Sequence, residues 1–189
     1  MASATVTRAD VERELLRELV AEELGLDVSA LVAPLWTPIP GPQQRAYESS
    51  ADILGYGGGA GGGKSSLEIG LAVTQHRDSI IFRREQTQVR DLWKKLRQVC
   101  GAHGRANENL LTIRDLPGDR QITLAGCKNE WDWTKFQGQG RDLMEFDEAT
   151  EFSEFQVRTL IAWNRTTIRG QRCRVVLSFN PPTRPEGQW

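Results

Sequence analysis

The stretch GYGGGAGGGKSS, residues 55–66, constrains the fold of this chain more than any other segment. Six of the seven residues from Gly57 to Gly63 are glycine, and glycine loses more conformational entropy on folding than any other residue. Such a run also contributes almost no side chain to a core. A folded domain therefore keeps it only where bare backbone has a use, such as a sharp turn or the close approach of a ligand.

Apolar segments flank this run on both sides. Residues 51–57, ADILGYG, predict a short buried strand, and residues 64–75, KSSLEIGLAVTQ, predict a buried helix. From Gly58 to Ser65 the chain fits G-x-x-x-x-G-K-[ST], whose backbone N–H groups converge on phosphate oxygens at a helix N-terminus. A flexible linker would also be rich in glycine, but it would not be flanked by a strand and a helix. The residues expected to form this phosphate-binding loop are Gly58, Gly59, Ala60, Gly61, Gly62, Gly63, Lys64, Ser65 and Ser66.

Strands and helices alternate along the rest of the chain. This order predicts an α/β fold with three layers, in which helices cover both faces of a mainly parallel central sheet, as in P-loop NTPases of the RecA/ASCE type. Ligands of such sheets bind at the carboxyl ends of the strands. The expected elements are a strand over 79–85, an amphipathic helix over 89–99, two strands around the turn at 117–119, a strand ending at 146, a capped helix over 153–163 and a last strand over 174–179.

An acidic pair follows the strand of residues 143–146. Asp147 comes directly after this apolar run, and Glu148 is the next residue. In a phosphoryl-transfer site Lys64 would meet the β- and γ-phosphates, while Ser65 and Asp147 would hold Mg²⁺. Glu148 is placed to polarise an attacking water. The alternative is a pair of solvated loop acids. The guanine-reading pattern Asn-Lys-x-Asp is absent from the sequence, which favours ATP over GTP.

Two regions differ in composition. Residues 1–33 predict an N-terminal helical arm, with apolar residues at helical spacing over about 7–24, and residues 34–189 predict the ATPase domain. Four prolines within residues 34–42 predict an extended connector between them. The arm docks either on its own domain or on a partner.

Charge, cysteine content and hydropathy narrow the class of protein. The net charge is −1, with three basic and seven acidic residues in 1–33, so charge does not indicate a nucleic-acid-binding protein. The three cysteines are scattered and suit a reducing compartment; Cys100 and His103 lack the further ligands that structural zinc needs. The sequence contains no signal peptide pattern and no apolar run long enough for a membrane span, so no membrane partner is expected.

Four segments together resemble the ATPase domain of the large terminase subunit of tailed bacteriophages, over residues 36–189. They are PGPQQRAYESSADILGYGGGAGGGKSS, SIIFRREQTQVRDL, KFQGQGRDLMEFDEATEF and LSFNPP. The resemblance implies that Gln43 reads the adenine edge, that Arg83 and Arg84 face nucleotide or DNA, and that Asn180 senses the γ-phosphate. The alternatives are a loop cap for Gln43, a solvated strand end for the arginines and a strand terminator for Asn180.

The resemblance also implies a motor that uses ATP and Mg²⁺ to drive double-stranded DNA into procapsids. Its partners would be the DNA, the portal protein, the small terminase subunit and further copies of the chain in a ring; a monomer in isolation is the alternative. It would act in the host cytoplasm, at the portal. Arg141 and Arg165 are candidates for the arginine finger, or else surface or fold-pairing residues. Arg165, Arg169, Arg172 and Arg174 could face DNA phosphates, or form a solvated turn.

The sequence departs from the family in two respects. After residue 151 the only acids are Glu154 and Glu186, too few for the two-metal site of the family's nuclease domain, so no nuclease activity is expected. The chain would then be part of a longer protein or the product of a shortened or split gene. Residues 59–62 also lack the arginine that some relatives carry in the phosphate loop. Two alternative functions remain, a helicase-like DNA-tracking ATPase and a nucleotide-binding assembly module with little turnover of its own.

Overall fold

The structure, a computed structural model, describes residues 34–59, 61–182 and 188, together with the helical residues Leu16, Leu19, Val20 and Glu23. Most of the helix predicted over residues 7–24, and Ala60 of the glycine run, lie outside the described residues. The chain divides into two units, Met1–Pro34 and Leu35–Trp189. All elements named below belong to the second unit.

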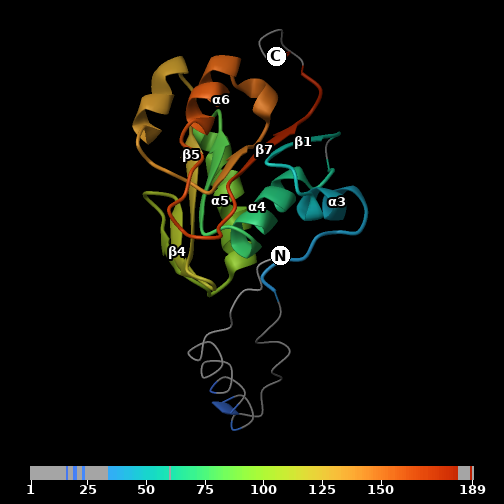
Figure 1. Ribbon diagram of the computed structural model, residues 1–189, viewed down its shortest axis with the longest axis vertical. Helices are drawn as coiled ribbons and strands as arrows, with labels where there is room; N and C mark the ends of the chain where they lie inside the picture. Colours follow the sequence, from blue (N-terminus) through green and yellow to red (C-terminus); the bar gives the residue numbers. More distant parts are fainter. Residues whose placement is uncertain are drawn as a thin grey trace. The chain divides into compact units, whose positions relative to one another are not determined.

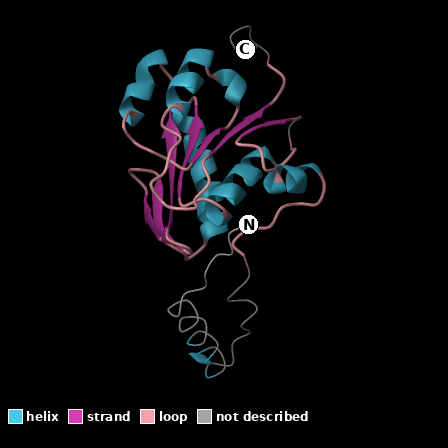
Figure 2. Cartoon of the chain, in the orientation of Figure 1, coloured by secondary structure: helices cyan, strands magenta, loops and turns pink. Residues whose placement is uncertain are grey.

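In the described part of the chain, seven strands form one sheet in the order β1-β7-β6-β2-β5-β4-β3 (Figures 1 and 2). The first five strands of this order are parallel to one another, while β4 and β3 are antiparallel additions at one edge, next to β5. The carboxyl ends of the parallel strands therefore share one edge of the sheet. The strands are β1 (Ile53–Gly57), β2 (Asp78–Arg83), β3 (Arg105–Asn107), β4 (Thr112–Leu116), β5 (Arg120–Gly126), β6 (Leu143–Phe146) and β7 (Arg174–Phe179).

Helices follow the strands in the predicted order. Three were not predicted from the sequence: α3, which begins at Pro42, and the 3-10 helices η1 and η2. Proline is well suited to the first turn of a helix, where its missing N–H has no intrahelical partner. None of the described helices combines the length and apolar composition that a membrane span requires. The helices are α3 (Pro42–Glu48), α4 (Lys64–Thr74), α5 (Gln86–Cys100), η1 (Glu130–Phe136), η2 (Ala149–Glu151) and α6 (Glu154–Ile161).

Two hydrophobic cores lie on opposite faces of the sheet. Successive residues of one strand point to opposite faces, and Ile81 of β2 accordingly packs in one core while Ile80 and Phe82 pack in the other. The first core contains the apolar residues of α4 and α5, which lie side by side (Figure 1). The second contains those of α6, together with Phe146 of β6. The three-layer α/β fold predicted from the sequence is confirmed.

The order of the strands decides which loops meet. β7 lies between β1, which leads into the glycine run, and β6, which leads into the acidic pair. The residue that follows β7 is Asn180. The fold therefore places Asn180 between two segments that are about 80 residues apart in the sequence.

Candidate functional site

The glycine run forms the turn between β1 and α4. Gly61 and Gly63 have φ angles of 81° and 72°, the left-handed region that disfavours side chains. Gly63 is also the residue that precedes α4, and a β-carbon there would lie 2.6 Å from Nε2 of Gln43. The backbone conformation therefore favours glycine at this position, and a larger residue would displace the Gln43 amide.

Two side chains brace this loop from outside. The Gln43 amide, which is buried, donates from Nε2 to the Gly63 carbonyl at 2.9 Å and accepts at Oε1 from the Ile39 N–H at 2.6 Å. The Tyr56 hydroxyl donates to the Gly62 carbonyl at 3.2 Å. These bonds make Gln43 a loop brace, with one amide hydrogen and one lone pair left for a ligand.

A pocket of about 370 Å³ lies beside the loop. One wall is glycine backbone and the other is mostly apolar, so the pocket suits a flat ring next to a phosphate group. Ser66 lies outside this lining, and its hydroxyl accepts a hydrogen bond from the Trp36 indole at 3.0 Å. The pocket is lined by Ile39, Pro40, Pro42, Gln43, Tyr56, Gly57, Gly58, Gly61, Gly62, Gly63 and Lys64.

Lys64, the first residue of α4, is only 7% exposed, and all three of its donors are in use. Its Nζ donates to the carbonyls of Gly58 and Gly59 at 3.0 and 2.9 Å, and to Oδ1 of Asn180 at 2.8 Å. The ammonium group therefore fills the hollow of the loop and ties it to the end of β7.

Asp147 is 1% exposed, and donors from three other elements surround its carboxylate. Its Oδ2 accepts from the Ser65 hydroxyl at 3.0 Å and from Nε and Nη2 of Arg83 at 2.8 and 2.7 Å. Its Oδ1 accepts from the Ser178 hydroxyl at 3.3 Å. A hydroxyl and a carboxylate in contact are the hard oxygen donors that Mg²⁺ prefers. The residues predicted to hold the metal therefore fit that ion.

Glu148 has a backbone conformation that is uncommon for a residue with a side chain. Its φ and ψ are 59° and 55°, in the left-handed region, and such strain is concentrated at functional sites. Both carboxylate oxygens accept from Nδ2 of Asn180, at 3.0 and 2.9 Å. The side chain thus reaches from the end of β6 across to the end of β7.

Two buried acids behind Asp147 were missed by the sequence analysis. Glu68 of α4 and Glu145 of β6 are both 0% exposed. Burial raises the pKa of each well above its ordinary value; the charge of Asp147 adds to the effect at Glu68, and that of Glu68 adds at Glu145. An acid inside an otherwise apolar helix or strand was the available signal.

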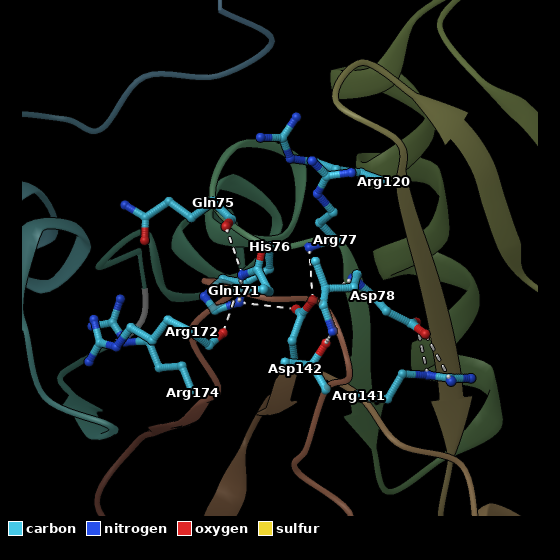
Figure 3. A network of polar contacts seen from close by, with 12 residues as sticks. Gln75, His76, Arg77, Asp78, Arg120, Arg141, Asp142, Gln171, Arg172 and Arg174 are labelled. Carbon is cyan, nitrogen blue, oxygen red and sulfur yellow. Dashed lines mark hydrogen bonds and ion pairs between the residues drawn. The ribbon is translucent and has the colours of Figure 1, made fainter. Parts of the chain in front are cut away.

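Arg141 lies away from this cluster, at the amino end of β6 (Figure 3). Its Nε and Nη1 each lie 3.2 Å from the carboxylate of Asp78, where β2 begins. Next to it, the buried carboxylate of Asp142 accepts from the backbone of Arg77 and Asp78 and contacts Nδ1 of His76. The structure does not bring Arg141 to the phosphate loop, and its contacts are those of a fold-pairing residue.

The other arginines are placed as follows. Arg84 donates to the Glu151 carbonyl at 2.6 Å, whereas Arg83 faces Asp147. Arg174 is 0% exposed and donates to the Ala46 carbonyl, so both expectations for it, a contact with DNA phosphates and a place in a solvated turn, are wrong. Arg172 is paired with Asp52, and Arg165 lies over the Trp163 ring at 4.7 Å.

The fold has been observed before. The large terminase of bacteriophage HK97 matches with a TM-score of 0.57 at 10% sequence identity, over 77% of this chain and 34% of that one. The large terminase of a thermophilic bacteriophage matches with a TM-score of 0.55 at 18% identity, over 76% and 39%. The same thermophilic-phage protein in complex with ATP-gamma-S matches with a TM-score of 0.54 at 16% identity, over 76% and 38%.

No protein-family model matches the chain, and no curated protein matches it. At these identities the structural likeness establishes the fold, and it confirms at that level the resemblance to large terminases. The chain spans between 34% and 39% of the length of these solved proteins.

Proposed function

We propose that this chain is the ATPase motor domain of a phage large terminase, which hydrolyses ATP with Mg²⁺ to drive double-stranded DNA into procapsids. The observation that carries the proposal is the chain of contacts Lys64–Asn180–Glu148 beside Ser65–Asp147. It joins three segments at the carboxyl edge of a parallel sheet, where such folds bind ligands. The thermophilic-phage terminase with this fold has complexes with ADP and with ATP-gamma-S.

Each residue of the cluster has a role that its position supports. The loop backbone and Lys64 would bind the β- and γ-phosphates. Ser65 and Asp147 would hold a magnesium ion, which when bound neutralises charge on the phosphate oxygens. Glu148 would orient the attacking water and accept its proton at a carboxylate oxygen. The water oxygen then bonds to the γ-phosphorus as the bond to the ADP oxygen breaks.

Asn180 would couple the two halves of this site. Its carbonyl oxygen is bound to Lys64 and its amide nitrogen to Glu148. A γ-phosphate that attracts Lys64 would break the hydrogen bond from Lys64 to the Asn180 side-chain carbonyl. The Asn180 side chain could then turn, which would also break its hydrogen bonds to Glu148. This links occupancy of the loop to the position of the base.

The pocket beside the loop would take the base of ATP. Gln43 lines it and keeps one donor and one acceptor position free after bracing the loop, which are the groups that an adenine edge requires. The apolar wall would pack against the ring face. We propose ATP as the nucleotide on these grounds.

The partners belong to the same proposal. The chain would form a ring at the portal in the host cytoplasm, with the small terminase subunit, and would grip DNA through its backbone irrespective of sequence. An arginine from a neighbouring subunit would complete the site. Arg141 is not the residue we propose for that role, because its guanidinium is already paired with Asp78 of its own chain. We propose no nuclease activity for these residues.

The test is the release of phosphate from Mg·ATP over a wide range of protein concentration. We expect a rate per subunit that rises with concentration and falls by a factor of about 10² or more in Glu148→Gln. Glu154→Gln, on the exposed start of α6, serves as the matched control and should keep the wild-type rate. Equal rates in wild type and Glu148→Gln would contradict the assigned base.

A second function has one observation in its favour. Asn180 is hydrogen-bonded to both Lys64 and Glu148, which would keep turnover low in an isolated chain by holding both side chains in place. A nucleotide-binding assembly module would then bind ATP with a flat, negligible rate at every protein concentration. The same experiment separates this function from the motor.

A further inference from the structure

Arg83 makes an unusually close contact with the carboxylate predicted to hold the metal. Its Nε and Nη2 lie 2.8 and 2.7 Å from one oxygen, Oδ2 of Asp147. The Asp147 side chain is 1% exposed and that of Arg83 is 17% exposed. The ion pair is therefore held largely away from water, where an unpaired carboxylate would be costly.

This contact fills the acceptor capacity of one oxygen of Asp147, Oδ2. Each carboxylate oxygen offers about two acceptor positions, and Oδ2 already receives three donors, Nε and Nη2 of Arg83 and the Ser65 hydroxyl, while Oδ1 receives the Ser178 hydroxyl. A metal ion at Ser65, or a water bound to it, can approach Oδ2 only if one of these three donors leaves. The two serine hydroxyls can rotate, but the guanidinium is the donor that carries a positive charge.

We propose that Arg83 is an internal counter-cation of Asp147 and that it leaves this carboxylate when Mg²⁺ and nucleotide bind. The inference rests on the proposed function and deepens it. Like charges repel, so a guanidinium and a magnesium ion would not share the same carboxylate oxygen. The exchange keeps Asp147 neutralised both before and after binding.

The other cations of the cluster already have partners. Lys64 is occupied by the loop and by Asn180. Arg84, the adjacent arginine, is bound to the Glu151 carbonyl. Arg83 is thus the cation that pairs with Asp147, the carboxylate proposed to hold the metal.

The first experiment measures Mn²⁺ binding without nucleotide, by the loss of the free-ion electron paramagnetic resonance signal. We expect wild type to bind Mn²⁺ weakly and Arg83→Gln to bind it at least about fivefold more tightly. This substitution removes the positive charge and leaves a neutral side chain that can still donate a hydrogen bond. Arg90→Gln, an exposed arginine of α5, controls for the change in net charge. Equal Mn²⁺ affinity in wild type and Arg83→Gln, or tight binding in wild type, would overturn the proposal.

The second experiment uses the wild-type chain and does not depend on any variant folding. The Arg83 Nε–H signal in nitrogen-15 NMR should shift on addition of Mg·ADP and stay in place with ADP in excess chelator. A signal that does not move with Mg·ADP, although ADP binds, would overturn the exchange and leave the proposed function intact. Absence of nucleotide binding to wild type would instead overturn the proposed function, while the Mn²⁺ comparison still decides on Arg83.

Discussion

The side-chain amide of Asn180 lies 3.0 and 2.9 Å from the two carboxylate oxygens of Glu148, and the carbonyl oxygen of the same amide lies 2.8 Å from Nζ of Lys64. One planar group thus joins the lysine of the phosphate loop to the acid that follows β6. The amide can do this because its two ends have opposite hydrogen-bonding character.

The first prediction concerns this amide. Asn180→Asp keeps the shape of the side chain but places a second carboxylate against Glu148. We expect the rate of ATP hydrolysis to fall by about 10²-fold, because a misplaced base loses its alignment with the water, while ATP still binds. Asn109→Asp, on an exposed turn, is the matched control. Wild-type turnover in Asn180→Asp would mean that Asn180 does not position Glu148.

The second prediction concerns the glycine before α4. Gly63→Ala should lower the free energy of unfolding by about 1–2 kcal/mol, the cost of the left-handed conformation for a residue with a side chain. It should also weaken ATP binding, because the new methyl group displaces Gln43. Gly59→Ala is the control for stability, since its φ is not in the left-handed region and a β-carbon there meets no atom within 4 Å. Urea unfolding and ATP titration measure both effects; equal stability of the two variants would contradict the assignment.

The third prediction concerns Asp142, at the opposite edge of the sheet (Figure 3). Asp142→Ala leaves the N–H groups of Arg77 and Asp78, and the ring of His76, without their acceptor. We expect a loss of about 3–5 kcal/mol in the free energy of unfolding, as for other broken buried pairs. The exposed Asp91, paired with Lys94 on α5, gives the control Asp91→Ala, which should change stability much less, because exposed ion pairs contribute little. ATP affinity of the folded fraction should be unchanged in both, and a loss of affinity in Asp142→Ala would show that the two edges are coupled.

The fourth prediction concerns the pH dependence of stability. The pKa of Glu68 is raised in the folded chain, first by burial and then by the charge of Asp147, so the folded state binds more protons than the unfolded state above pH 4.5. The contribution of Glu68 to the free energy of unfolding should therefore fall as pH rises from about 4.5 toward the pKa of Glu68 in the folded chain. Glu68→Gln should flatten this slope and stabilise the fold on the alkaline side. Urea midpoints measured between pH 5 and 9 test the sign; a steeper fall in Glu68→Gln would contradict it.

Local patterns in the sequence were sufficient for most of the elements. The glycine run, the acidic pair after an apolar strand and the capping box at Ser153 are each contained within a few residues, and each depends on local backbone geometry or periodicity. The helices α3, η1 and η2 were missed because they are short. Short helices gain little from propensity and depend on their packing.

The sequence by itself determined that a phosphate loop, two acids and an asparagine follow strands of a parallel sheet, since strand ends and helix starts are local properties. Only the tertiary structure decided which strand ends are neighbours. Because β7 lies between β1 and β6, Asn180 contacts both Lys64 and Glu148. In the same sheet Arg83 pairs with Asp147 at the carboxyl edge, whereas Arg141 pairs with Asp78 at the opposite edge. Strand order follows from how the crossover helices pack on the two faces of the sheet, and this depends on contacts between residues far apart in the chain.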